Sequence, residues 1–245
     1  MVYFLTSNPC LPDFPALNPA NGFVDELQKA LPETCRALFI SSDPDDDANL
    51  RRFAEGMERG FAEIGIRFAE LSLLFRETQD ECGYLLTHSD VVFLCGGHVP
   101  TQNRFFQEID LRKELRNWIW ILHGNVTECG DVSAGTMNCE ELVYAPPEEE
   151  GEAVDPNYQR FYPGLGLTRH MIFPHFQDTR YEVVDGLPTL ESSLLPDSMG
   201  RSIYALVDGS FLLGKDGGEE LRGEAYLIEN GVLTQISREG DVIPL

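Results

Sequence analysis

The sequence contains no long hydrophobic run, and this lack excludes a membrane-spanning helix. Its longest tight apolar run, from Trp118 to Leu122, is far shorter than the ~20 residues that such a helix needs. The first ten residues have no basic segment, and their apolar stretch is too short for a signal peptide. We therefore expect a cytoplasmic protein.

Basic residues are scarce. The chain has 18 Lys and Arg against 41 Asp and Glu, which gives a net charge of −23. Such a surface repels phosphate backbones and anionic lipid, so we expect neither nucleic-acid binding nor membrane binding. An acidic substrate would need a few arginines inside the site to reverse the local field.

The cysteines form no CxxC pair and no zinc-type spacing. Because no secretory signal is present, we expect mostly buried thiols. The six are Cys10, Cys35, Cys82, Cys95, Cys129 and Cys139.

The 245 residues, 42% of them hydrophobic, contain no repeat and no low-complexity linker. The one shift in composition is the Pro- and acid-rich stretch 146–157, which reads as a loop rather than a domain boundary. We expect a single α/β domain over residues 1–245.

In the first half, apolar runs alternate with amphipathic helical patterns. Strands are expected at Val2–Thr6, Ala37–Ser41, Phe68–Leu74 and Val91–Cys95, and helices at 21–31 (through an Asn cap), 43–65 and 80–87. This alternation predicts a mostly parallel sheet with helices on both faces.

The middle of the chain is harder to interpret. Residues Gln102–His123 read best as one long helix that Gly124-Asn125 would end, although "WIWIL" alone also fits a strand. A strand at Val126–Val132 would then lead to Ser133. After His175, Asp-Gly, Gly-Gly and Asn-Gly pairs separate β-rich runs and predict antiparallel hairpins.

"GDVSAGTMN" (130–138) places Ser133 among small residues. The segment fits a nucleophilic serine on a strand–turn–helix, and it also fits an ordinary helix N-cap. Ala134 and Gly135 would avoid a clash where strand and helix meet. The N–H of Ala134 would point at a developing oxyanion.

"CGGHVPTQN" (95–103) follows a strand with two glycines. Gly97 would let a backbone N–H approach a ligand closely and supply a second oxyanion donor, with His98 lining the pocket. A Gly-Gly pair after a strand is more often a plain turn, so neither segment is sufficient alone.

A catalytic serine also needs a base. His175, in "MIFPHFQD", lies at the tip of a short apolar run and is the preferred base. His88 and His123 read as capping or solvent-facing residues, and His170 or His98 is the alternative.

Together these segments resemble the dipeptidase E/cyanophycinase family of serine peptidases. The likeness includes "PGLGL" (163–167) ahead of "IFPHF" and the terminal "YALVDGSFL…GEAYLIENG", and so runs nearly the whole chain. It implies a flavodoxin-like α/β sheet akin to class I glutamine amidotransferases, with serine in place of their cysteine. It also implies hydrolysis of peptide bonds next to aspartate without metal or cofactor.

Carried onto this chain, the resemblance makes Ser133 the nucleophile and His175 the general base, with the N–H groups of Gly97 and Ala134 as the oxyanion hole. The family's third residue is an acid. The expected acids are those of one loop, Glu150 first and Glu148 next, then Glu149 and Glu152. Asp178 or a backbone carbonyl is the alternative support for His175.

Two departures from the family pattern bear on substrate and reactivity. Asp131 stands where relatives usually have glycine, and His98 stands where dipeptidase E has asparagine. The arginine that grips the aspartyl side chain has no clear counterpart. Arg180 is the first candidate, with Arg169 and Arg201 as alternatives.

The expected protein is therefore a serine hydrolase of small peptides, acting as a monomer or homodimer. The alternative keeps the fold in a binding or sensing protein, or in a hydrolase of another amide. A glutamine amidotransferase is disfavoured by the serine at position 133. An α/β-hydrolase is disfavoured because it expects GxSxG.

Overall fold

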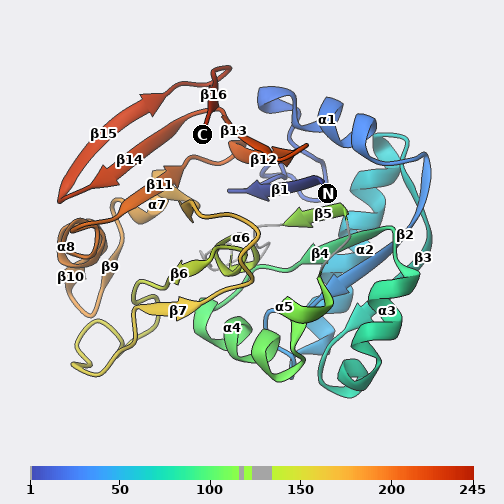
Figure 1. The fold of residues 1–245 in the computed structure, drawn as a ribbon, viewed down its shortest axis with the longest axis horizontal. Helices are drawn as coiled ribbons and strands as arrows, with labels where there is room; N and C mark the ends of the chain where they lie inside the picture. The colour runs from blue at the N-terminus through green and yellow to red at the C-terminus, as the bar shows by residue number, and fades with distance from the viewer. Residues whose placement is uncertain (1, 116–118, 123–133) are drawn as a thin grey trace.

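The chain folds around an eight-stranded mixed sheet (Figure 1) in the order β16-β13-β12-β1-β5-β4-β2-β3. In this computed structural model residues 2–115, 119–122 and 134–245 are described, and 119–122 as backbone only. Five adjacent strands run parallel: β1 (Val2–Thr6), β5 (Ile119–Leu122), β4 (Val91–Leu94), β2 (Thr34–Ile40) and β3 (Arg67–Leu74). Antiparallel strands extend the sheet beyond β1: β12 (Phe211–Lys215), β13 (Gly218–Arg222) and β16 (Val242–Pro244).

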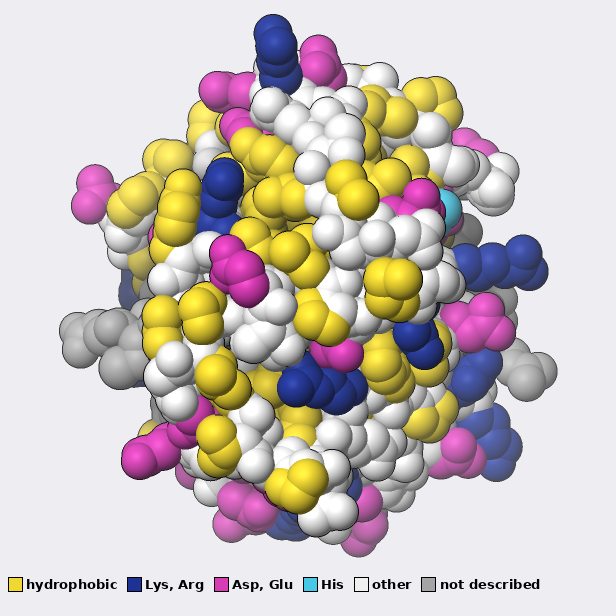
Figure 2. Space-filling view, turned by 90° about the vertical axis from the view of Figure 1, so that its left-hand side faces the viewer, with side chains coloured by type: hydrophobic (Ala, Val, Ile, Leu, Met, Phe, Trp, Pro, Cys, Tyr) yellow, Lys and Arg dark blue, Asp and Glu magenta, His cyan; other side chains and the backbone are white. Residues whose placement is uncertain are grey.

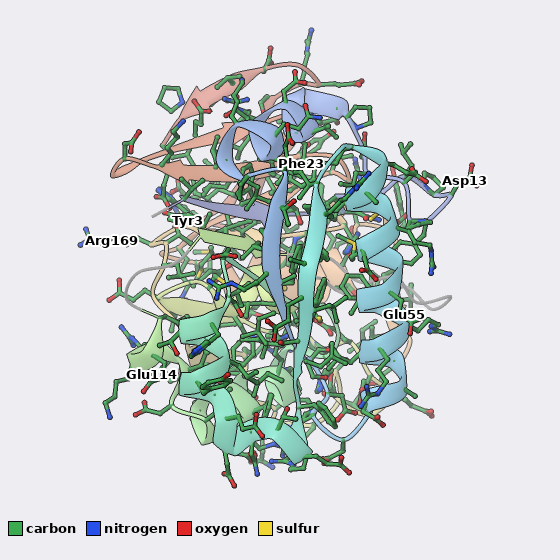
Figure 3. All side chains as sticks on the ribbon, turned by 90° about the vertical axis from the view of Figure 1, so that its right-hand side faces the viewer. Tyr3, Asp13, Phe23, Glu55, Glu114 and Arg169 are labelled. Atoms are coloured by element: carbon green, nitrogen blue, oxygen red, sulfur yellow. The ribbon has the colours of Figure 1, made fainter. Side chains whose placement is uncertain are left out.

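Helices cover both faces of the parallel part, as the alternation predicted. Leu38 and Val92 pack in one core beneath α3 (Cys82–His88), α4 (Val99–Glu108) and α5 (Leu111–Glu114). Phe39 and Phe93 point to the other face, under α1 (Phe23–Ala30) and α2 (Asp47–Glu63). Figure 3 shows α2 and α3 on opposite sides of β3. Because both faces are covered, these strands read as continuous apolar runs.

The two N-terminal helices begin differently. Asp46 caps α2, its carboxylate accepting the N–H of Asn49 at 3.0 Å. The expected asparagine cap of α1 is wrong. Asn21 lies in a preceding turn, η1 (Ala20–Gly22), and its side chain instead donates to the carbonyl of Gly209 at 2.8 Å.

The long helix expected over Gln102–His123 is also wrong. Helix α4 ends at Glu108, Asp110 takes a left-handed conformation with φ 49°, and a short α5 follows. Residues Ile119–Leu122 then form β5, which pairs with β1 on one side and β4 on the other. Residues Ile119–Leu122 form a strand because β1 and β4 offer their backbone groups hydrogen-bond partners on both sides. The strand expected at Val126–Val132 lies outside the described residues.

The last third forms a second sheet in the order β15-β14-β11-β8, which confirms the antiparallel hairpins. Its strands are β8 (Met171–Phe173), β11 (Ser202–Leu206), β14 (Ala225–Glu229) and β15 (Val232–Ser237). Only β8 and β11 pair in parallel within it. A third core joins this sheet to α6 (Ala134–Asn138) and to β6 (Leu142–Tyr144), which pairs with β7 (Phe161–Pro163).

One side of the molecule carries β9 (Val183–Val184), β10 (Leu187–Pro188), η3 (Leu190–Leu194) and α8 (Leu195–Asp197). Figure 2 shows hydrophobic side chains spread between charged ones over this face. Tyr181, Val183 and Met199 are among its exposed apolar residues. This face of the molecule thus presents some apolar side chains to solvent.

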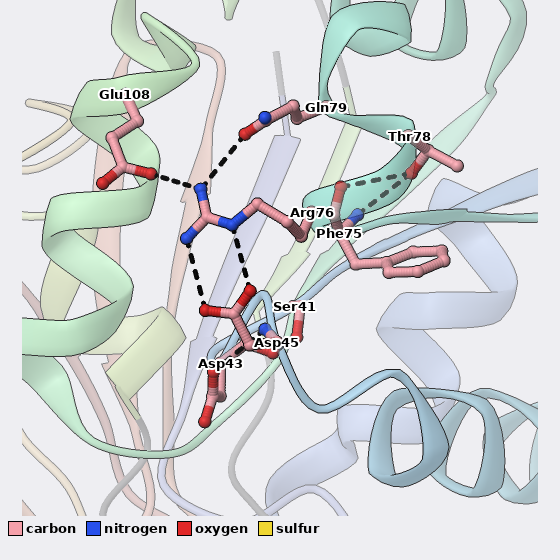
Figure 4. Close-up of polar contacts among 8 residues, drawn as sticks. All are labelled: Ser41, Asp43, Asp45, Phe75, Arg76, Thr78, Gln79 and Glu108. Carbon is pink, nitrogen blue, oxygen red and sulfur yellow. Dashed lines mark hydrogen bonds and ion pairs between the residues drawn. The ribbon is translucent and has the colours of Figure 1, made fainter.

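Arg76, in the turn η2 (Arg76–Glu81), joins three segments at one edge of the main sheet (Figure 4). Its guanidinium contacts Asp45 Oδ1 at 3.1 Å and Glu108 Oε2 at 2.6 Å. These contacts raise the pKa of Arg76. The end of α4 is thereby tied to the loop that precedes α2.

Five of the six cysteines lie in the described residues, and all five are buried free thiols, as expected. Burial raises the pKa of each, for example to about 11 for Cys35. No helix in the described part of the chain has the length and apolar character required to cross a bilayer.

Candidate active site

His175 and Asp208 meet at the end of the second sheet. Nδ1 of His175 lies 2.7 Å from Oδ1 of Asp208. Strand β8 leads to His175 and strand β11 leads to Asp208. Because these strands are parallel neighbours, with Phe173 opposite Ala205, their carboxyl ends bring the two side chains together.

Ser7, directly after β1, holds both members of this pair. Its Oγ accepts the backbone N–H of His175 at 2.8 Å and donates to Asp208 Oδ1 at 2.8 Å. Asn8 also donates to Asp208, at 3.4 Å. Burial alone would raise the pKa of Asp208, but the hydrogen bonds from His175, Ser7 and Asn8 and the charge of His175 lower it. Asp208 is therefore an anion that holds a proton on His175 Nδ1.

The backbone of His175 is itself constrained. The residue is the N-cap of α7 (Phe176–Thr179) and takes the left-handed conformation, with φ 53°. Non-glycine residues seldom adopt this conformation, and those that do are frequent at functional sites. The conformation turns the chain sharply between β8 and α7 and leaves the imidazole at the strand tip.

Ser133 lies outside the described residues, but the helix that follows it is described. Ala134 and Gly135 are buried at the start of α6. A Cβ on Gly135 would lie 2.1 Å from the carbonyl oxygen of Leu94, so α6 rests directly on the end of β4. Thr136 Oγ1 donates to the carbonyl of Thr6 at 2.8 Å. The start of α6 and the His175–Asp208 pair are thus both anchored on the carboxyl end of β1.

Gly97 follows β4 in a conformation that only glycine adopts readily, with φ 149°. A Cβ there would lie 2.5 Å from Ser42 Oγ. The glycine is therefore required by both backbone conformation and space.

The acidic loop after β6 turns the carboxylate of Glu152 toward His98. Its Oε1 lies 3.0 Å from His98 Nε2, while Oε2 accepts the backbone N–H groups of Glu148 and Glu149 at 2.9 and 3.0 Å. Nδ1 of His98 lies 2.9 Å from Thr101 Oγ1. Asp185 accepts the N–H of Gly151 at 2.8 Å. The loop is held at both ends and packs against the residue after Gly97.

Asp208 is the carboxylate on His175 Nδ1, whereas Glu150, the first acid expected from the sequence, is exposed, and Glu148, the next, is half-buried. In the sequence, Asp208-Gly209 indicates only a hairpin. Asp208 is recognised as the partner of His175 through the pairing of β8 with β11, which joins segments distant in the sequence. Asp178, the other alternative, is exposed and accepts the side chain of Gln177 at 2.8 Å.

The remaining described histidines do not join this pair in the contacts that the structure gives them. His170 Nε2 lies 3.2 Å from Glu219 Oε2 on β13. His88 is exposed, with Nδ1 2.8 Å from the carbonyl of Tyr84, as expected for a solvent-facing residue. His123 lies outside the described residues.

Two of the three candidate arginines lie against aromatic rings. Arg180, the C-cap of α7, has its guanidinium carbon 5.5 Å from the ring centre of Phe176 and 4.9 Å from that of Tyr181. Arg201 lies 4.2 Å over Phe161. Arg169 is exposed and points outward in Figure 3.

Glu140, two residues after the end of α6, is a buried carboxyl near the site. It accepts the backbone N–H groups of Ile172 and Tyr144, and Oε2 is buried without a hydrogen-bond partner. Burial raises its pKa well above the ordinary value, which favours the protonated form of the carboxyl. It links the end of α6 to β8, the strand that leads to His175.

Among the described residues, His98, Glu149 and Glu152 offer ligand atoms within 4.8 Å of one another. His98 and Glu152 already bond to each other, and Glu152 also binds two backbone N–H groups. These contacts hold the side chains of His98 and Glu152 in place.

The fold and site define a mixed α/β protein with a histidine–carboxylate pair at the carboxyl ends of parallel strands. The family model of peptidase family S51 matches residues 3–221, and the chain belongs to this family. The resemblance to dipeptidase E is thereby confirmed, and family membership supports a serine peptidase.

One solved structure with this fold is that of a candidate peptidase E from Listeria monocytogenes EGD-e. It covers 96% of this chain and 98% of its own, with a TM-score of 0.55 and 13% sequence identity. At this identity the likeness supports the fold. No curated protein matches the sequence significantly.

Proposed function

We propose that the whole chain is one hydrolytic domain that cleaves small peptides next to aspartate through Ser133, His175 and Asp208. The single observation that carries the proposal is the 2.7 Å contact between His175 and Asp208. The five parallel strands with helices on both faces support the flavodoxin-like arrangement that the resemblance implied.

In the proposed reaction Ser133 Oγ attacks the peptide carbonyl carbon and His175 Nε2 takes its proton. The tetrahedral oxyanion receives hydrogen bonds from the N–H groups of Gly97 and Ala134. As the C–N bond breaks, His175 returns the proton to the leaving amine. Water, deprotonated by His175, then hydrolyses the acyl-enzyme. Asp208 stabilises the imidazolium and keeps the reactive tautomer.

Two residues are proposed to bind substrate. Arg180 would bind the aspartyl carboxylate, since it sits at the other end of the short helix that begins with His175 and its guanidinium is held by aromatic rings. His98 adjoins Gly97 and is fixed by Glu152 and Thr101. Arg180→Met should therefore raise KM for Asp-X dipeptides more than for Ala-X dipeptides.

The test is a fluorophosphonate label combined with a dipeptide screen of Asp-X, β-Asp-X and arginine-containing substrates. The native chain should be labelled at Ser133, and Ser133→Ala should abolish labelling and lower kcat by about 10⁶. A folded native chain that is neither labelled nor active on any of these peptides would replace the proposal with the alternative, a non-peptidase relative on the same fold.

A further inference from the structure

Three side-chain amides are buried between α4 and α6. Gln102 and Asn138 are fully buried, and Asn103 is 3% exposed. A buried amide costs free energy unless its donors and acceptor are hydrogen-bonded, so the partners of these groups indicate their role.

The amides form one connected network. Gln102 Nε2 donates to the carbonyl of Cys95, and Gln102 Oε1 accepts from Asn138 Nδ2 at 3.1 Å. Asn138 Nδ2 also donates to the carbonyl of Val99 at 3.2 Å. Asn138 Oδ1 accepts from Asn103 Nδ2 at 2.8 Å, and Asn103 Nδ2 also donates to the carbonyl of Pro163 at 3.1 Å. The contacts of Gln102 and Asn138 are to backbone carbonyls or to other members of the network, and Asn103 Oδ1 also accepts from Gln107 Nε2 at 2.6 Å.

The network joins two particular segments. The Cys95 carbonyl lies at the end of β4, just before Gly96 and Gly97, and Val99 opens α4 just after that turn. Asn138 is the last residue of α6, the helix that starts with Ala134. A short helix moves as a unit, so fixing Asn138 also fixes Ala134.

A contact between α6 and the end of β4 limits the position of α6 on a second side. Leu94 O lies so close to Gly135 that α6 cannot move nearer to β4. The directional hydrogen bonds of Gln102 and Asn138 keep it from sliding or moving away. The apolar contacts around Val99, Ala134 and Met137 are not directional and would not set this separation.

We infer that Gln102 and Asn138 are positioning residues that set the separation between the backbone N–H groups of Gly97 and Ala134. The inference rests on the proposed function, in which these two groups bind the oxyanion. An oxyanion hole acts only when its donors are preorganised at the position that the charge will occupy. The amide network supplies that preorganisation from behind the site, without touching substrate.

The direct test replaces each amide by an apolar side chain of similar size, as Gln102→Met and Asn138→Leu. Each should lower kcat and the fluorophosphonate labelling rate by about 10²-fold, the effect of misplacing reacting groups by about 1 Å. KM should change little, because binding does not depend on the oxyanion. The matched control is Gln107→Met. It removes the 2.6 Å bond from Gln107 to Asn103 Oδ1 but leaves in place the bonds of Gln102 to Cys95 and of Asn138 to Val99.

A second variant separates positioning from stability. Gln102→Glu retains an acceptor for Asn138, and when protonated it also retains a donor for Cys95. The ratio of its kcat to that of the native chain should be highest at low pH and should fall as the new carboxyl ionises. This readout remains if the apolar variants fail to fold.

Three outcomes would overturn the inference: native kcat in a folded Gln102→Met, a loss confined to Tm, or a pH-independent ratio for Gln102→Glu. By contrast, a folded native chain that is neither labelled nor active would refute the proposed function itself. The two failures are therefore distinguishable.

Discussion

Nδ1 of His175 lies 2.7 Å from Oδ1 of Asp208, which follows the neighbouring parallel strand, and Ser7, which follows a third strand, binds both residues. The pair therefore belongs to the junction of two sheets rather than to one loop. The same end of β1 anchors Thr136 of α6 through Thr6. A displacement of β1 would consequently move the proposed base and the helix after Ser133 together.

Asp208→Asn should lower kcat by up to about 10⁴ while leaving the fold intact, because the amide no longer stabilises the imidazolium or its tautomer. Steady-state kinetics on the best dipeptide measures this. Glu150→Gln is the matched control, since Glu150 is exposed, and it should behave like the native chain. The reverse pattern, with the loss at Glu150, would restore the acidic loop as the source of the acid.

Gly97→Ala should lower kcat by about 10²–10³, as expected when one oxyanion donor is misplaced. The new Cβ meets Ser42 Oγ, and the backbone conformation is strained as well. Adding Ser42→Gly should relieve the clash and restore part of the activity. Gly65→Ala, at a left-handed position with open space around it, controls for strain alone. Full activity in Gly97→Ala would remove Gly97 from the proposed oxyanion hole.

Glu140→Gln should change how stability depends on pH. A folded-state pKa raised above the ordinary 4.5 favours folding fully below that value, and the contribution is lost as pH rises through the folded pKa. The glutamine variant has no such loss. Its Tm should be close to native at pH 5 and above native at pH 8 to 9. Parallel Tm curves for the two proteins would mean that Glu140 is not a neutral acid in the fold.

Glu152→Ala should release the acidic loop. The substitution removes the contact with His98 and the acceptor of the Glu148 and Glu149 N–H groups. Thermolysin should then cleave near the exposed Val154 faster than in the native chain, in proportion to the opened population. Glu150→Ala leaves those bonds in place and serves as control. Equal cleavage in both variants would contradict the role given to Glu152.

The sequence predicts some segments of this fold and leaves others ambiguous. Strands β1 to β4 and helix α2 follow from apolar periodicity, because each buries a face that its own residues define. "WIWIL" is ambiguous by the same measure, and its residues Ile119–Leu122 become a strand only because β1 and β4 leave room between them. In the acidic loop the sequence favours Glu150, whereas the structure leaves Glu150 exposed and turns Glu152 toward His98.

The sequence by itself determined the features that depend on residues close together in the chain. It specified glycine where a Cβ would collide at positions 97 and 135, and a histidine at a strand tip. Only the tertiary structure decided which carboxylate contacts that histidine and which amides join α4 to α6. Those contacts depend on pairing and packing between segments distant in the chain, and nothing in the residues near His175 or Asn138 encodes the partner.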